Sequence, residues 1–397
     1  MKTVDQFNFK GIRAVIRVDF NVPLNENLEV TDDTRIRAAI PTIHKILKDG
    51  GSVVLMSHLG RPKEGPTNKY SLKHIVPELE KQFNKKISFA EDCISDASFE
   101  QSASMSDGEI LLLENLRFYK EEEKGDKSFA AKLARHGNFY VNDAFGTAHR
   151  AHASTTIIAE NFDSSHKCFG YVMAGEVENI NKVLHQAEKP FTAIIGGAKV
   201  SDKILIIEKL MEKADNIIIG GGMAFTFVKA MGGHIGKSLC ETDKQDIALS
   251  LLEKAKSRGI GFYLPSDAII ADDFKNEANH EECNVNEIPD GWMGLDIGKN
   301  TSKHYAEIIS QSKTILWNGP MGVFEMSNFE QGTKAVAESI AKVTAKGSYS
   351  LIGGGDSVAA INKYHLGNQV SYVSTGGGAL LEYIEQGSLP GVKAIED

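Results

Sequence analysis

Residues 191–203 read FTAIIGGAKVSDK, and this stretch decides what kind of fold to expect. The apolar run 191–195 predicts a buried strand, Gly196-Gly197 predicts a turn, and the residues from Lys199 onward predict the first turn of a helix. Free N–H groups and the helix dipole favour an anion at such a junction. Lys199 and Lys203 would lie on one face of that helix and reach one phosphate chain. The alternative is a plain turn with two solvated lysines, since GxxxxGK(S/T) is absent here.

Four further apolar runs in the second half also end in glycine. They lie at 216–219, 314–317, 348–352 and 370–374, before Gly220-Gly221-Gly222, Gly319 with Gly322, Gly353-Gly354-Gly355 and Gly376-Gly377-Gly378. Glycine at one edge of a sheet lets backbone approach a large ligand and aim N–H groups at it. None of these segments fits GxGxxG, so a dinucleotide-binding half is not expected.

The first half has apolar runs that end in charged or polar residues. These runs lie at 14–18, 52–56, 110–113 and 139–141, and a helical pattern covers 34–48. Alternating strands and helices predict βαβ units, a parallel sheet, and ligands at the carboxyl ends of the strands.

The predicted fold class is α/β, with two doubly wound parallel-sheet (Rossmann-like) domains joined by an interdomain helix and hinge. The length of 397 residues favours more than one domain. Residues 174–189 read as an amphipathic helix that Pro190 stops, so we place domains at 1–173 and 190–374 with this helix between them. The alternative is an ordinary crossover helix within one sheet.

Composition excludes several classes of function. The net charge of −9 argues against a general nucleic-acid binder, which needs a basic face. The four cysteines are far apart and form no CxxC pair, which favours free thiols in a reducing cytosol. The start lacks an apolar signal segment, and no apolar run approaches the ~20 residues of a membrane span. We therefore expect a cytoplasmic protein that binds neither nucleic acid nor membrane.

The polar strand ends of the first half suggest a pocket for a small anion. Arginine suits bidentate binding of phosphate or carboxylate. Asp19 and Asn21 would orient substrate hydroxyls or cap a turn, and each arginine taken singly has a structural alternative on the surface. The candidate basic residues are Arg35, His58, Arg61, Arg117, His149 and Arg150.

In the second half, Asp356 follows three glycines and precedes a helix start. It is a candidate partner for Mg²⁺, which one or two carboxylates and phosphate oxygens usually hold, or else an N-cap. Glu325 is a candidate for a ribose hydroxyl or a solvated loop acid. Gly236-Lys237-Ser238 resembles the end of a P-loop, but Met231 stands at the required first glycine, so we predict no function for it.

The remaining patterns point to positioning chemistry. The run 121–124, EEEK, predicts a solvated charged stretch. No nucleophile elbow, HExxH or Cys/His cluster is present, which favours charge neutralisation over covalent catalysis and fits phosphoryl transfer. The sequence thus predicts one domain for a small anion and one for a nucleotide phosphate chain.

Nine segments, in order along nearly the whole chain, resemble the signature segments of the phosphoglycerate kinase family. They are VDFNVP (18–23), SHLGRP (57–62), LLENLRF (112–118), NDAFGTAHRAHAST (142–155), GGAKVSDK (196–203), GGGMAFTF (220–227), WNGPMGVFE (317–325), GGGDS (353–357) and STGGGA (374–379).

The resemblance implies reversible phosphoryl transfer between ATP and the carboxylate of 3-phosphoglycerate, giving ADP and 1,3-bisphosphoglycerate, in glycolysis and gluconeogenesis. It implies Mg²⁺ as part of Mg-ATP, with Asp356 as its ligand, and a monomer in which hinge closure brings two substrates together and excludes water. It also implies that residues 375–397 pack back on the N-terminal domain.

Site residues follow from the same resemblance. Arg35 and Lys199 would be catalytic, stabilising charge on the group in transfer. Residues implied to hold phosphoglycerate are Asp19, Asn21, Arg35, His58, Leu59, Gly60, Arg61, Arg117, His149 and Arg150. Residues implied to hold the nucleotide are Lys199, Lys203, Gly294, Glu325, Gly354, Gly355, Asp356 and Ser357.

Two other functions stay open from the sequence. One is a kinase with another small phosphorylated acid as its acceptor. The other is a catalytically silent nucleotide-binding or regulatory protein of the same fold, which loss of Arg35, Lys199 or Asp356 would favour; all three are present.

Overall fold

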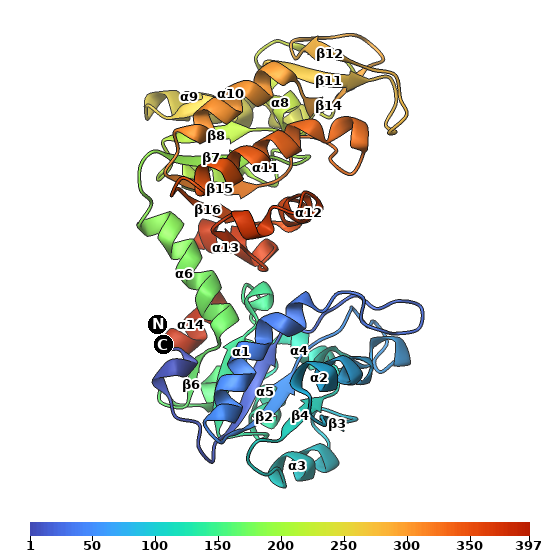
Figure 1. Ribbon diagram of the computed structural model, residues 1–397, viewed down its shortest axis with the longest axis vertical. Coiled ribbons are helices and arrows are strands. Elements are labelled where there is room, and N and C mark those ends of the chain that lie inside the picture. The colour runs from blue at the N-terminus through green and yellow to red at the C-terminus, as the bar shows by residue number, and fades with distance from the viewer. The chain divides into compact units, whose positions relative to one another are not determined.

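All 397 residues are described in the computed structural model, in which the two predicted sets of strands form two separate parallel sheets (Figure 1). The chain divides into two units. We call Met1–Glu178 together with Gln386–Asp397 the N-unit, and Asn179–Glu385 the C-unit.

The N-unit is built on a six-stranded sheet whose neighbours all pair in parallel. Its central strands are buried on both faces, as expected for strands read from continuous apolar runs. The chain order reverses between β1 and β5, the position where open α/β sheets bind ligands. In spatial order the strands are β3 (Ser88–Ala90), β4 (Ile110–Leu113), β2 (Ser52–Met56), β1 (Arg13–Val18), β5 (Phe139–Asp143) and β6 (Lys167–Phe169).

Helices cover this sheet. The predicted helix at 34–48 is confirmed as α1, which buries Ile36, Ile43 and Ile46 against the core. The helices of the N-unit are α1 (Thr34–Lys48), α2 (Val76–Phe83), α3 (Asp96–Ala103), α4 (Lys120–Lys124), α5 (Lys127–Ala134) and α14 (Pro390–Glu396).

The C-unit repeats the architecture with a second six-stranded parallel sheet. Its order reverses between β7 and β15, whose ends lie in register with Asn318 beside Ile195. In spatial order the strands are β10 (Gly261–Tyr263), β8 (Asn216–Ile219), β7 (Phe191–Ile195), β15 (Thr314–Asn318), β16 (Tyr349–Ile352) and β17 (Tyr372–Val373).

Smaller sheets and seven helices complete the C-unit. An antiparallel sheet consists of β12 (His280–Asn284), β11 (Asp267–Ala271) and β14 (Met293–Ile297), and β13 (Glu287–Ile288) pairs with β9 (His234–Ile235). The helices are α7 (Ile204–Leu210), α8 (Met223–Ala230), α9 (Gln245–Ser257), α10 (Lys299–Ser310), α11 (Gln331–Thr344), α12 (Gly355–Lys363) and α13 (Gly378–Gln386).

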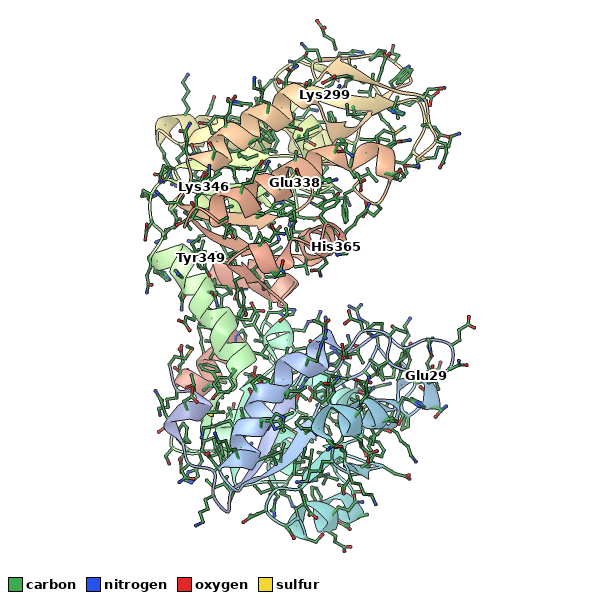
Figure 2. All side chains as sticks on the ribbon, viewed as in Figure 1. Glu29, Lys299, Glu338, Lys346, Tyr349 and His365 are labelled. Carbon is green, nitrogen blue, oxygen red and sulfur yellow. The ribbon has the colours of Figure 1, made fainter.

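The helix predicted at 174–189 begins and ends earlier, as α6 (Tyr171–His185), and the boundary between the units falls within it. Asp143 Oδ1 accepts hydrogen bonds from the N–H groups of Val172 (2.8 Å) and Met173 (3.2 Å), which fixes the start of α6. In the C-unit, Tyr349 donates to Asn179 Oδ1 at 2.5 Å, so the second half of α6 is held by β16 (Figure 2).

The C-terminal segment joins the N-unit later than residue 375. Apart from its last residue, α13 belongs to the C-unit, where Leu380 packs against Gly353. From Gln386 the chain lies with the N-unit, where the N–H of Gly391 donates to Ala148 O at 2.9 Å.

The prediction of a solvated run at 121–124 is wrong for one residue. Glu122 lies in α4 and is fully buried, and its carboxylate is satisfied there by the N–H (3.0 Å) and the hydroxyl (2.5 Å) of Ser154, from which it accepts. A run of charged residues does not show which side of a short helix packs against the rest of the protein.

Candidate active site

The residues predicted to bind an anion in the N-unit lie around the position where its strand order reverses. Val18 and Asp143, at the ends of β1 and β5, lie side by side in the sheet. Just beyond β1, Asp19 Oδ2 accepts a hydrogen bond of 2.7 Å from Arg35 at the start of α1. The guanidinium of Arg35 is thereby oriented by a carboxylate while its side chain stays 41% exposed, open to a ligand.

The loop after β2 is held from two sides. Asn21 Oδ1 accepts from the N–H of Gly60 at 2.8 Å, and Arg117 donates to Gly60 O at 3.0 Å. Asn115 Nδ2 donates to Leu59 O at 2.7 Å. Gly60 has φ +62°, and a Cβ there would meet the ring of Tyr70 at 2.3 Å, so only glycine fits. Predicted residues from three strand ends therefore contact one another.

Electrostatic coupling links the buried members of the cluster. Burial lowers the pKa of His58 well below its usual value, and Arg17, Arg117 and Arg35 lower it further. Burial also lowers the pKa of Arg117, with Arg17 and Arg150 adding to the effect. At neutral pH, His58 is therefore a neutral ring among guanidinium groups.

Two of the remaining basic residues lie at the surface of this region, and a further histidine there was not predicted from the sequence. Arg61 and Arg150 are exposed, and Arg150 Nε lies 3.1 Å from His149 Nε2. His152 was not predicted. It is buried, and its pKa is lowered to about 4 by burial and by Arg117, Arg17 and Arg150. Its place two residues after Arg150 in the quoted motif was the available signal.

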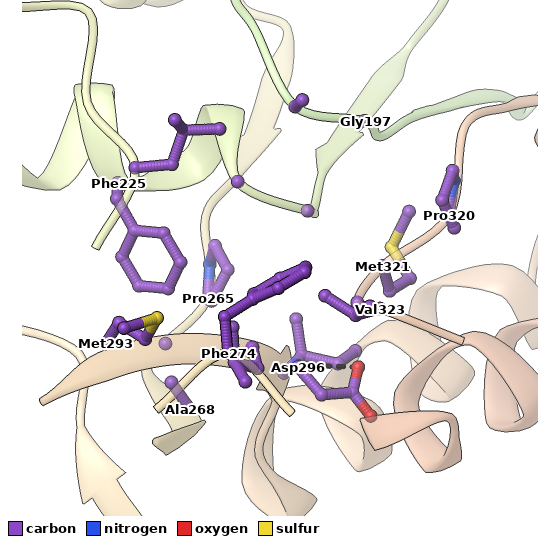
Figure 3. A pocket seen from close by; sticks show the side chains of 18 of the residues that line it. Gly197, Phe225, Pro265, Ala268, Phe274, Met293, Asp296, Pro320, Met321 and Val323 are labelled. Carbon is purple, nitrogen blue, oxygen red and sulfur yellow. Dashed lines mark hydrogen bonds between the residues drawn. The ribbon is translucent and has the colours of Figure 1, made fainter. Parts of the chain in front are cut away.

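In the C-unit, a cavity of about 540 Å³ opens at the carboxyl ends of the strands (Figure 3). Three predicted nucleotide residues, Gly294, Glu325 and Asp356, line it, and Gly197 and Gly221 contribute backbone. The N–H of Gly294 donates to Ser238 Oγ at 2.9 Å, and a Cβ on Gly294 would meet the Phe225 ring at 2.0 Å. The backbone of Gly294 thus forms part of the cavity wall where no side chain would fit.

Apolar side chains that were not predicted form most of the cavity wall. In Figure 3, the ring of Phe274 projects into the cavity, with Phe225 and Met293 toward one side and Met321 and Val323 toward the other. Phe274 is 59% exposed, which is unusual for a large apolar residue. A flat aromatic ligand such as a nucleobase fits walls of this kind.

The predicted anion site at 196–203 is organised differently from the sequence prediction of free N–H groups. The N–H groups of Gly196 and Gly197 are not free, since they donate to Asn318 O (2.8 Å) and Pro320 O (3.2 Å). A Cβ on Gly196 would lie 2.1 Å from Pro320 O. These glycines therefore let neighbouring strand-end loops pack backbone against backbone.

The prediction that Lys199 and Lys203 lie on one helix face is also wrong. Helix α7 begins at Ile204, with Lys203 just before it. The preceding residues form a turn because the carboxylate of Glu241 accepts from the N–H (3.0 Å) and the hydroxyl of Ser201. Lys203 Nζ donates to Asn318 Oδ1 at 2.5 Å, whereas Lys199 is exposed.

Asp356 lies in the first turn of α12. The N-cap of that helix is Gly354, with φ +93°, so the N-cap alternative for Asp356 does not hold. Ser357 Oγ accepts from the N–H of Gly319 at 2.5 Å, and Asn318 Nδ2 donates to Gly353 O at 2.7 Å. Gly355 and Asp356 are exposed at this helix start, where a negative ligand is favoured.

The structure contains no group of three or more His, Cys, Asp or Glu side chains placed to hold a metal ion. Asp356, which lines the cavity, is thus not part of a ready metal-binding group, and its carboxylate fits Mg²⁺ only when phosphate oxygens complete the donor set. No helix has the length and apolar character needed to cross a membrane. The segment Gly236-Lys237-Ser238 is not a P-loop, yet Lys237 lines the cavity.

Comparisons of the sequence and of the fold with known proteins point to one family. A model of the family "Phosphoglycerate kinase" matches residues 4–387. A phosphoglycerate kinase of Porphyromonas gingivalis is 52% identical over 99% of this chain and all of its own length, and a cytosolic one of Nicotiana tabacum is 50% identical over 100% and 98%. The structure of phosphoglycerate kinase from Coxiella burnetii superposes with a TM-score of 0.91, at 40% identity over 99% of this chain and 98% of that one.

Proposed function

The chain belongs to the phosphoglycerate kinase family, and from that premise we propose how its residues divide the work of the reaction. The reaction is reversible phosphoryl transfer between ATP and the carboxylate of 3-phosphoglycerate, a step of glycolysis and gluconeogenesis. The observation that carries the assignment is the pair of sites at the two strand-order reversals, one rich in arginine and one apolar with glycine backbone.

We propose that the N-unit binds 3-phosphoglycerate. The phosphate and carboxylate of this substrate match the exposed guanidinium of Arg35 and the arginines around the Gly60 loop. Asp19 and Asn21 hold Arg35 and Gly60, and each keeps hydrogen-bonding capacity for a hydroxyl group. The proposed set is Asp19, Asn21, Arg35, His58, Leu59, Gly60, Arg61, Arg117, His149 and Arg150.

We propose that the C-unit binds the nucleotide. The apolar cavity would take the base, and Glu325 at its wall would accept a hydrogen bond from the ribose. The phosphates would extend toward Lys199, Lys203 and the start of α12 at Gly354, Gly355, Asp356 and Ser357, where the helix dipole favours negative charge. Gly294 would form the wall beside the base.

Mg²⁺ is the proposed cofactor, held by Asp356 together with phosphate oxygens of the nucleotide. When bound, it would neutralise part of the phosphate charge. The protein itself would contribute by positioning charge: Lys199 of the C-unit and Arg35 of the N-unit would both face the phosphoryl group that is transferred. Both cations would stabilise charge that is greatest in the transition state, and neither forms a covalent intermediate.

Because the two substrates are assigned to different units, we propose that the units approach each other during each cycle. Closure would remove water from the phosphoryl group and prevent its hydrolysis. We further propose a cytoplasmic monomer that binds no nucleic acid or membrane. The net charge of −9 and the cytosolic tobacco relative support this, and size-exclusion chromatography with light scattering tests the monomer.

A coupled assay tests the function. Purified protein is mixed with Mg-ATP and 3-phosphoglycerate, and 1,3-bisphosphoglycerate is followed by NADH oxidation through an added dehydrogenase. We expect activity that requires both substrates and Mg²⁺. Omitting each component in turn is the control, and replacing 3-phosphoglycerate with other small phosphorylated acids tests the acceptor. Nucleotide binding without transfer would contradict the assignment.

A further inference from the structure

A buried pair of opposite charges lies under the anion site of the N-unit. Arg17 on β1 is 1% exposed, and Glu122 on α4 and Ser154 are fully buried. Ser154 bridges the two charges: its Oγ accepts from Arg17 Nε at 2.8 Å and donates to Glu122 Oε1 at 2.5 Å. Glu122 Oε2 also accepts from the N–H of Ser154 at 3.0 Å. The three side chains thus form one continuous hydrogen-bonded chain.

The guanidinium of Arg17 has a partner at each nitrogen. Besides Ser154, it donates to the carbonyl oxygen of Val18 through Nη1, and Nη2 lies 3.2 Å from His58 Nδ1. Arginine has five N–H donors and no acceptor. The hydrogen bond to His58 therefore exists only if Nδ1 carries a lone pair, which places the proton of a neutral ring on Nε2.

Resting on the proposed function, we propose that Glu122, Ser154 and Arg17 are positioning residues that hold His58 in its Nε2–H tautomer as a neutral hydrogen-bond donor to 3-phosphoglycerate. The opposite tautomer would turn the Nε2 lone pair toward an anionic oxygen, which repels it. A neutral donor also adds a hydrogen bond among arginines without adding another positive charge. Burial and the neighbouring arginines keep the pKa of His58 low, in agreement with a neutral ring.

A stabilising role accounts less well for the arrangement. A buried ion pair costs desolvation energy, and well-packed apolar residues often replace such pairs without loss of stability. Polar networks of this kind do fix one geometry of the groups they contact. Here the hydrogen-bonded network reaches the candidate site at His58, which is 4% exposed and lies two residues beyond β2.

The first test uses the unaltered protein. Long-range ¹H–¹⁵N spectra of ¹⁵N-histidine-labelled protein report which ring nitrogen carries the proton, and His58→Gln serves only to assign the His58 signals. We expect His58 Nε2 protonated and Nδ1 unprotonated. A proton on Nδ1 in the free protein would overturn the proposal, whatever the two variants described next show.

The second test removes the bridge with Ser154→Ala. We expect mixed tautomers at His58 and a KM for 3-phosphoglycerate raised about tenfold, the loss of roughly one hydrogen bond to a charged group, with the KM for ATP unchanged. The matched control is Ser102→Ala, since Ser102 is also buried and its Oγ lies 2.9 Å from His136 Nδ1. That variant should alter the His136 signals and leave His58 and both KM values as they are.

Arg17→Lys is a second variant that keeps the buried charge but loses the planar fork that reaches both Ser154 and His58. It should reproduce the tautomer change and the rise in KM for 3-phosphoglycerate. Variants with an unchanged His58 spectrum and unchanged KM values would refute the positioning role. Absence of 3-phosphoglycerate-dependent activity in the unaltered protein would refute the proposed function instead, whatever tautomer His58 shows.

Discussion

Lys363 Nζ lies 2.7 Å from the carbonyl oxygen of Phe324, to which it donates a hydrogen bond. The same nitrogen lies 2.6 Å from a carboxylate oxygen of Glu330. Lys363 is the last residue of α12, the helix assigned to the phosphates, and Phe324 directly precedes Glu325, which is assigned to the ribose. One side chain therefore connects the two parts of the proposed nucleotide site.

Replacing Lys363 with methionine should raise the KM for ATP roughly three- to tenfold, because the loop that carries Glu325 loses a charge-assisted hydrogen bond. The KM for 3-phosphoglycerate should not change. Lys346→Met, at an exposed lysine after α11 (Figure 2), is the matched control in the coupled assay. Equal changes in both KM values would indicate a general loss of structure instead.

Lys199→Ala should reduce kcat on the order of a hundredfold, with little loss of ATP affinity, because its charge is needed most in the transition state. Steady-state kinetics and calorimetric titration of ATP separate the two quantities. Lys209→Ala, at an exposed lysine of α7, should change neither. Near-normal turnover in Lys199→Ala would remove this residue from the catalytic site.

Arg117→Ala should raise the KM for 3-phosphoglycerate roughly ten- to a hundredfold, since a partly desolvated cation that also holds the Gly60 loop is lost. The KM for ATP should stay the same. Arg37→Ala, at an exposed arginine on α1, serves as the control. An unchanged KM for 3-phosphoglycerate would exclude Arg117 from the anion pocket.

Chelation of divalent metal should abolish turnover, and Asp356→Asn should raise several-fold the Mg²⁺ concentration needed for half-maximal rate, because the amide is a weaker ligand than a carboxylate. Titration of Mg²⁺ at fixed ATP measures this shift. Asp202→Asn, which removes an exposed carboxylate near Lys203, should leave the Mg²⁺ titration unchanged. The same titration curve for Asp356→Asn would argue against Asp356 as the ligand.

The stability of the N-unit should carry a pH signature of Asp143. Burial raises the pKa of this carboxyl from 3.8 to about 7. Between these values the folded chain binds a proton that the unfolded chain lacks, so Asp143 lowers the free energy of unfolding as pH rises, by at most ~1.4 kcal/mol per pH unit.

In Asp143→Asn this contribution disappears. Chemical unfolding of both proteins between about pH 4 and 8 should show the stability of the native protein falling relative to the variant up to pH 7 and then running parallel. Asp107→Asn, at an exposed carboxylate, is the control. Parallel curves throughout would mean that Asp143 does not titrate in this range.

The sheets were predictable because their strands are buried on both faces and read as unbroken apolar runs. The runs at 52–56, 110–113, 191–195 and 216–219 are strands with the same bounds in the structure. The amphipathic pattern at 34–48 likewise matches α1 from end to end. Such local patterns also placed Asp19, Arg35, Gly60 and Arg117 at the ends of one sheet.

Features that depend on distant residues were not predictable. Glu241, forty residues along the chain from Ser201, holds the turn that delays α7 and separates Lys199 from it. The partner of the buried Glu122 is likewise distant along the chain, since Ser154 lies thirty-two residues after it. The cavity wall residues Phe274 and Met293 come from a loop and an edge of a small antiparallel sheet, where no local pattern marks a ligand.

The C-terminal residues complete the N-unit, and this affects how the chain is made. Lys167 Nζ donates to Ala394 O at 2.8 Å, and Asn142 Nδ2 lies 3.3 Å from Gly391 O, so β5 and β6 take partners from α14. During synthesis on the ribosome, the first half emerges long before these partners exist. A stop codon a few residues early would therefore damage the half of the protein that was translated first.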